Sequence, residues 1–168
     1  MTLWDNLTDS ACVPERLLQW LREHGVDAEL LRPGVPMPTV PLAAAAIGVP
    51  EEQIIKSLLF ADGNGSSVLA IACGMSKVDR QRLAAASGLT QPRLADPATV
   101  LAVTGFPAGG VAPVGHRTPV RVIVDRRVAE QNVVYGGGGA EDALLRIAPR
   151  DILRLTNGFV ADLVGETT

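Results

Sequence analysis

Residues 105–116, with the sequence GFPAGGVAPVGH, constrain the fold of this chain more than any other stretch. They combine glycines and prolines with almost no charge. Proline fixes φ and removes a hydrogen-bond donor, whereas glycine permits positive φ and a close approach of the backbone. Such a loop can aim main-chain N–H groups at a small anion or a carbonyl oxygen. The other interpretation is a tight connection between two core strands, because Gly/Pro clusters usually mark turns.

The composition is typical of one soluble, globular domain. A chain of 168 residues suits a single core, and 47% hydrophobic with 20% charged residues argues against disorder. The formal net charge of −3 offers no basic footprint for DNA. The N-terminus lacks a signal-peptide pattern, and the longest apolar stretch, residues 40–50, is too short to span a membrane. Cys12 and Cys73 show no metal-ligand or disulfide spacing, so we expect a reduced, cytoplasmic setting.

The order of elements along the chain predicts an α+β fold. Strand-turn-strand units mixed with short helices indicate a single domain with a mixed or antiparallel β-sheet, or a barrel-like core, surrounded by short helices. Residues 1–11 are expected to form a flexible N-terminal arm before a domain of residues 12–168. The predicted helices are 14–23, 42–47, 79–87, 98–103, 126–131 and 149–155, and the predicted strands are 26–31, 54–60, 67–73, 119–125, 132–135 and 143–147.

Lys56 is the anomaly in the apolar strand of residues 54–60. Lysine is almost never fully buried without a partner. In one interpretation it lies at a strand end, extends to solvent or pairs with Glu51, Glu52 or Asp62. In the other it projects from a rigid strand into a pocket and holds an anionic or carbonyl group. The sequence leaves both open.

Two further features are candidates for a site. The run Gly136–Gly139 is either a flexible hairpin tip or a pocket wall where side chains would collide with a ligand. His116 follows the glycine loop directly, so it either hydrogen-bonds the backbone or takes part in chemistry. His24 ends a predicted helix, where its charge is favourable.

Four motifs occur in a fixed order: IKSLLF at 55–60, the loop at 105–116 with Gly109-x-x-x-Pro113, VYGGGG at 134–139, and RIAPRDI at 146–152. Together they resemble the YbaK/EbsC family, in the superfamily of the prolyl-tRNA synthetase editing domain. The resemblance extends from about Val26 to Val164. It implies a YbaK-like single domain that hydrolyses the ester bond of mischarged aminoacyl-tRNA, often mischarged prolyl-tRNA, without a metal or cofactor.

The resemblance also implies roles for individual residues. Lys56, Gly109 and Gly110 would be the catalytic residues: the lysine positions the terminal adenosine or the substrate, and loop N–H groups hold the aminoacyl carbonyl. Preorganised donors of this kind stabilise the oxyanion of ester hydrolysis. The remaining candidates, all expected to bind substrate, are Val111, Ala112, Pro113, His116, Gly137 and Gly138. On this view Gly110→Val abolishes activity at little cost in stability, whereas His116→Ala is mild.

The sequence also departs from the family pattern. Many relatives carry a histidine or tyrosine on the strand before the lysine, where this chain has ELLR at 29–32. Several carry a histidine or aspartate near the second glycine segment, where this chain has glycine followed by Glu141 and Asp142. These differences leave open the amino acid and a second function class: a non-catalytic module that binds an aminoacyl or nucleotide end or regulates a synthetase. A bound synthetase would supply the tRNA affinity that the net charge does not.

Overall fold

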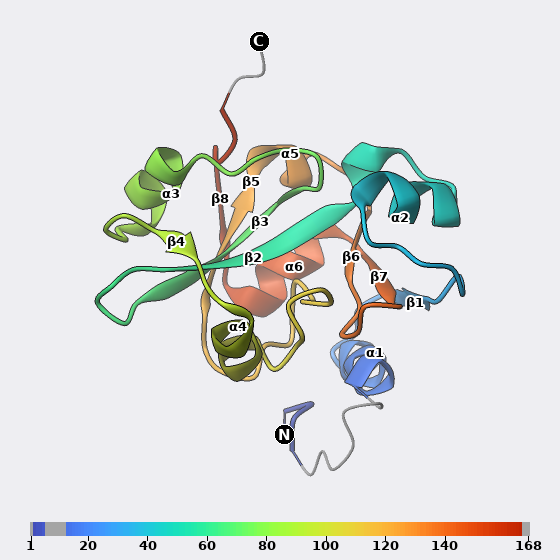
Figure 1. Cartoon of the computed structure of the whole chain (residues 1–168). Coiled ribbons are helices and arrows are strands. Elements are labelled where there is room, and N and C mark those ends of the chain that lie inside the picture. Colours follow the sequence, from blue (N-terminus) through green and yellow to red (C-terminus); the bar gives the residue numbers. More distant parts are fainter. Residues whose placement is uncertain (1, 6–12, 166–168) are drawn as a thin grey trace.

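The computed structural model describes residues 2–5 and 13–165, which form one domain built on two β-sheets (Figure 1). The helices are α1 (Val13–Glu23), α2 (Val40–Ile47), the 3-10 helix η2 (Glu51–Gln53), α3 (Arg80–Ser87), α4 (Pro97–Thr104), α5 (Arg126–Ala129) and α6 (Pro149–Thr156). The strands are β1 (Glu29–Leu31), β2 (Ile55–Ala61), β3 (Ser67–Cys73), β4 (Arg93–Leu94), β5 (Arg121–Asp125), β6 (Val134–Gly137), β7 (Leu144–Ile147) and β8 (Phe159–Ala161). The predicted α+β class is confirmed.

The larger sheet has the strand order β4-β2-β3-β5-β8 and is mixed. β2 and β3 form the predicted hairpin, with Ile55 opposite Cys73 and Ala61 opposite Ser67. Asp62 closes the turn, because its Oδ1 accepts from the backbone N–H groups of Asn64 and Ser66. β5 then adds parallel to β3, and β8 adds parallel to β5.

The smaller sheet has the order β1-β7-β6 and is antiparallel. A parallel bridge between Ile54 and Tyr135 joins it to the larger sheet. The molecule therefore has two sheets where the sequence predicted one sheet or a barrel-like core. The strand predicted for residues 26–31 is reduced to Glu29–Leu31, because only these residues pair with β7. The glycines of the 136–139 run belong to β6 as far as Gly137.

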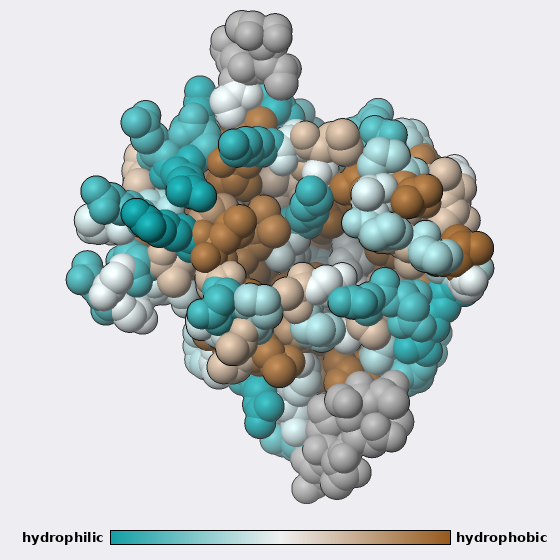
Figure 2. All heavy atoms as spheres, viewed as in Figure 1, coloured by the Kyte–Doolittle hydropathy of each residue, from teal (hydrophilic) through white to brown (hydrophobic). Residues whose placement is uncertain are grey.

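The main core cluster draws side chains from both sheets and from the helices around them. Leu17 and Leu21 of α1 and Ile152 of α6 are fully buried in it. A second cluster on the other face of the larger sheet lies under α3, whose Leu83 is fully buried. α3 covers only part of that face. Figure 2 shows apolar surface gathered in the middle of the molecule, where β2 and β4 come to the front.

Helix starts and stops follow the sequence closely. The Thr39 hydroxyl accepts from the N–H of Leu42 at the start of α2, and Gly48 ends that helix at φ 71°. Asp79 and Asp96 cap α3 and α4 in the same way. These caps fix the segments before and after β2 that approach the site.

Residues 2–5 belong to the segment expected as a flexible arm, and they pack on the domain. Leu3 is buried, and the indole Nε1 of Trp4 donates to the carbonyl of Gly115 at 2.8 Å. The Trp4 ring lies 5.1 Å from the ring of Phe106, in an edge-on arrangement. These contacts hold both ends of the glycine loop. The rest of the expected arm, residues 1 and 6–11, and Cys12 lie outside the described residues.

Candidate active site

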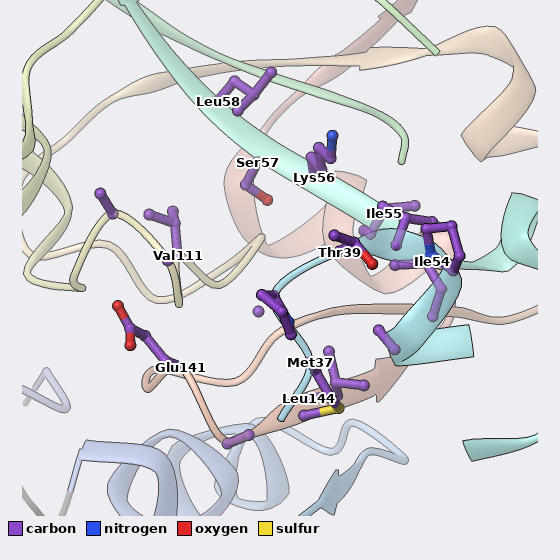
Figure 3. A pocket seen from close by; sticks show the side chains of 18 of the residues that line it. Met37, Thr39, Ile54, Ile55, Lys56, Ser57, Leu58, Val111, Glu141 and Leu144 are labelled. Carbon is purple, nitrogen blue, oxygen red and sulfur yellow. The ribbon is translucent and has the colours of Figure 1, made fainter. Parts of the chain in front are cut away.

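A cavity of about 620 Å³ lies at the first half of β2 (Figure 3). Five segments line it: the proline-rich stretch leading into α2, the start of β2, Met75 after β3, the glycine loop, and the β6–β7 hairpin. These segments are distant in sequence, and the Ile54–Tyr135 bridge brings the start of β2 next to β6. The proline-rich loop predicted between residues 32 and 38 thus contributes Met37 and Pro38 to the cavity.

Lys56 lines this cavity and is exposed. Its neighbours on β2, Ile55 and Ser57, are buried, because successive side chains of a strand point to opposite faces. Within the described part of the chain Lys56 forms no salt bridge, so the pairings considered with Glu51, Glu52 and Asp62 are not made. The structure therefore places an unneutralised ammonium group at the edge of the cavity.

The sequence reasoning missed three polar residues that line the cavity. Thr39 lines it from the start of α2, Ser57 from the buried side of β2, and Glu141 from the β6–β7 hairpin. Figure 3 shows Ser57 directed to the side of Val111 and Glu141, whereas Lys56 projects on the opposite side of the strand. The sequence signal that could have identified Ser57 is the alternation of Ile55, Ser57 and Leu59, which puts one polar residue on an otherwise apolar inward face of the strand.

The glycine loop is a rigid turn whose N–H groups are not equivalent. Gly105 and Gly115 adopt positive φ of 81° and 77°, and so bend the chain at both ends of the loop. The N–H of Gly110 donates to the carbonyl of Pro107 at 2.8 Å, so this predicted donor is already used. Among the described residues, no hydrogen bond engages the N–H groups of Gly109 or Val111, and both residues line the cavity.

The prediction that Gly110→Val costs little stability is wrong, for a structural reason. A Cβ on Gly110 would lie 2.7 Å from the backbone carbon of Ala140. Backbone cannot move aside as a side chain can, so this substitution strains the fold. The three atoms nearest to a Cβ on Gly109 all belong to the Glu141 side chain, the first at 3.0 Å. This side chain is exposed and can shift, so an alanine at Gly109 disturbs the packing less than one at Gly110.

The glycines of the 136–139 run permit close packing of the main chain against neighbouring main chain. A Cβ on Gly137 would lie 2.2 Å from the carbonyl oxygen of Val111, and one on Gly138 would lie 2.9 Å from the backbone of Ala143. The carbonyl of Gly110 also accepts from the N–H of Gly139 at 2.9 Å. The run therefore lies directly against the glycine loop. It is neither a free hairpin tip nor a wall shaped only for a ligand.

His116 contacts the loop from behind. Its Nε2 lies 2.8 Å from the carbonyl oxygen of Ala112, and its ring lies edge-on at 6.1 Å from Phe106. Burial lowers the pKa of His116 to about 4, against the opposing effect of the hydrogen bond to Ala112. The imidazole is therefore neutral at pH 7, and the contact requires its proton on Nε2.

The structure brings Lys56, Gly109, Val111 and Gly137 together around one cavity. The other predicted site residues surround this set without lining the cavity: Gly110, Ala112, Pro113, His116 and Gly138. Leu31, at the first departure from the family pattern, lines a separate hollow with Tyr135 and Arg146. Gly138, at the second, faces Ala143.

Within residues 2–5 and 13–165, no group of three or more histidine, cysteine, aspartate or glutamate side chains is arranged to hold a metal ion. None of the helices described is both long and apolar enough to cross a membrane.

The fold is that of aminoacyl-tRNA editing domains. The family model for the aminoacyl-tRNA editing domain matches residues 35–155, a range that contains all five lining segments, and the chain belongs to this family. The YbaK/EbsC resemblance is thereby confirmed.

Individual relatives agree with this assignment. The chain is 26% identical to the putative Cys-tRNA(Pro)/Cys-tRNA(Cys) deacylase EbsC of Enterococcus faecalis (strain ATCC 700802 / V583), over 71% of this chain and 73% of EbsC. It is 30% identical to the uncharacterized protein YwhH of Bacillus subtilis (strain 168), over 80% of this chain and 82% of YwhH. A solved structure described as a putative trans-editing enzyme for prolyl tRNA synthetase superposes with a TM-score of 0.79 at 32% identity, covering 96% of this chain and 100% of that one.

Proposed function

We propose that this protein is a free-standing aminoacyl-tRNA deacylase that hydrolyses the ester bond of mischarged aminoacyl-tRNA, with tRNA(Pro) as the first candidate. One observation carries the proposal: the unpaired Lys56 lines the same cavity as Gly109 and Val111, whose N–H groups make no hydrogen bond among the described residues. A cation for the polyanionic tRNA end and donors for a carbonyl oxygen are the two elements that ester cleavage on tRNA needs.

The reaction adds a water oxygen to the ester carbonyl carbon and gives a tetrahedral oxyanion. We assign the Gly109 and Val111 N–H groups to this oxyanion, since preorganised donors act most strongly where charge develops. The bond from the carbonyl carbon to the ribose oxygen then breaks. The free amino acid is released, and the ribose oxygen takes up the proton that the attacking water has lost. Neither histidine lines the cavity, so the hydroxyl groups of Thr39 and Ser57 have no imidazole base beside them there, and water is the nucleophile assigned here.

Lys56 has a positioning role in this scheme. Its ammonium group at the edge of the cavity contacts the terminal adenosine or its phosphate and so fixes the ester against the glycine loop. Orientation of this kind contributes to rate because it removes the entropy cost of alignment from the chemical step. The names of EbsC and of the solved relative support tRNA(Pro) as substrate and a prolyl-tRNA synthetase as partner.

The test is a panel of tRNAs, each charged with cognate and non-cognate amino acids and incubated with the full chain. The expected result is release of free amino acid from a subset of mischarged tRNAs, beyond spontaneous hydrolysis. Lys77→Ala serves as the matched control for Lys56→Ala, because Lys77 is also exposed but does not line the cavity. Binding of aminoacyl-tRNA without release would contradict the proposal and identify a non-catalytic module instead.

A further inference from the structure

Ser57 carries the unexplained polar atom of the cavity. The residue is only 8% exposed, and its Oγ is the one buried side-chain nitrogen or oxygen among the described residues that has no hydrogen-bond partner. Buried polar atoms are almost always partnered, because an unsatisfied hydroxyl loses its hydration without compensation. Since Ser57 lines the cavity, the missing partner is expected to come from the ligand.

The surroundings of Ser57 place it at the floor of the cavity. Ile55 and Leu59, on the same face of β2, are 3% and 2% exposed and belong to the main core. β4 pairs with β2 only at Phe60 and Ala61, so no strand ladder covers the outer edge of β2 at Ser57. The hydroxyl is thus enclosed on the core side, and on its other side the residue lines the cavity.

Lys56 and Ser57 define the two ends of the cavity. Lys56 is exposed at the edge, whereas Ser57 is buried and directed to the opposite side of β2 (Figure 3). The parts of an aminoacyl-tRNA can be arranged in the same order along the cavity. The tRNA stays outside, the ester lies next, and the amino acid side chain reaches farthest in. The charged end of the cavity suits the nucleotide, and the buried end receives the side chain.

Resting on the proposed function, we infer that the Ser57 hydroxyl hydrogen-bonds the side chain of the amino acid being removed, and that the pocket selects a small β-hydroxy amino acid of the serine type. The other polar side chains of the lining, those of Thr39, Lys56 and Glu141, are exposed, whereas Val111 and Leu144 beside Ser57 are apolar and buried. Among the described residues, Ser57 therefore supplies the buried hydrogen bond that discriminates between side chains. An apolar side chain of the same size leaves Ser57 unpartnered. A site built around a hydrogen bond rejects such an analogue far more strongly than an apolar pocket rejects a missing methylene.

The test compares serine with 2-aminobutyrate, which replaces the hydroxyl by a methyl group, on the same tRNA. Wild-type protein is expected to release serine at least about tenfold faster. Ser57→Ala is expected to remove most of this preference by slowing serine release alone. Thermal melts serve as a readout independent of activity: Ser57→Ala should melt at or above the wild-type temperature, because it deletes an unsatisfied polar atom. Ser66→Ala, in the exposed β2–β3 turn, is the control and should change neither measurement.

The outcomes separate this inference from the proposed function. If wild-type protein releases no amino acid from any tRNA, the deacylase proposal fails. If it is active but treats serine and 2-aminobutyrate alike, or if Ser57→Ala slows both equally, the selectivity inference is overturned and the hydroxyl serves the ester or the water. A large drop in the melting temperature of Ser57→Ala would also overturn it, because the hydroxyl would then have a structural partner.

Discussion

The two walls of the cavity differ in the groups that they present to a ligand. The β2 wall presents side chains, a lysine at the edge and a serine at the floor, on a strand held along its inner edge by β3. The opposite wall presents main chain at Gly109 and Gly137, beside the side chains of Val111 and Glu141. In the proposed function the first wall selects by charge and hydrogen bonding, whereas the second supplies N–H groups to the ester carbonyl. A change of side chain therefore tests the β2 wall, and an added side chain tests the glycine wall.

The largest effect is expected from Gly137→Ala, which inserts a side chain between the two glycine segments. The added Cβ would lie 2.2 Å from the carbonyl oxygen of Val111. Overpacking against backbone should lower the free energy of unfolding by at least about 3 kcal/mol, measured by denaturant melts. Gly63→Ala is the matched control, since a Cβ there meets no atom within 4 Å. An unchanged melting curve for Gly137→Ala would show that the glycine loop and the 136–139 run are not in contact.

The next largest effect is expected from Lys56→Ala, which removes the charge of the β2 wall. Deacylation should fall about a hundredfold or more, because the substrate loses its positioning contact, while stability stays within about 0.5 kcal/mol for an exposed residue. Single-turnover rates and melts measure the two quantities. Near-wild-type rates would show that Lys56 only extends to solvent.

Gly109→Ala is expected to act on chemistry without acting on the fold. The three atoms nearest to its Cβ belong to the exposed Glu141 side chain, which can shift, so the free energy of unfolding should change by less than about 1 kcal/mol. The methyl group faces the carbonyl position, and we expect about a tenfold loss of rate. Gly110→Ala provides the contrast: it clashes with the Ala140 backbone and should lower stability more than Gly109→Ala does. Equal melts for the two variants would contradict this difference.

The smallest effect on activity is expected from His116→Gln, because this side chain braces the loop from outside the cavity. The stability effect depends on pH. Burial lowers the pKa of His116 to about 4, so between the unfolded value of 6.5 and about 4 the unfolded chain binds more protons than the folded one. The wild type should therefore lose up to about 3 kcal/mol relative to His116→Gln as the pH falls through that window.

Urea melts at pH 7 and pH 4 measure this difference, and deacylation at pH 7.5 measures the catalytic effect. If His116→Gln lost as much activity as Lys56→Ala, the histidine would be a general base and the assignment of a bracing role would fail.

Local features of the sequence predicted the β2–β3 hairpin and the caps of α2, because an apolar run next to DGNG and a threonine before a helix act over a few residues. The separation into two sheets was not predictable in this way, since it depends on the pairing of β1 with β7. The use of the Gly110 N–H within the loop depends on the turn at Pro107. Ser57 was missed because its burial comes from packing against segments that are far away in sequence.

The pairing of β1 with β7 has a consequence for biosynthesis. Glu29 lies opposite Arg146, and these residues are 117 positions apart. Contacts of such high sequence separation form slowly, and during translation they must wait until the later strand has left the ribosome. The β2–β3 hairpin with Lys56 can therefore form early, whereas the glycine wall closes only when nearly the whole domain has been synthesised. We expect a nascent or truncated chain to carry the lysine without a completed site, so that hydrolytic capacity arises only in finished molecules.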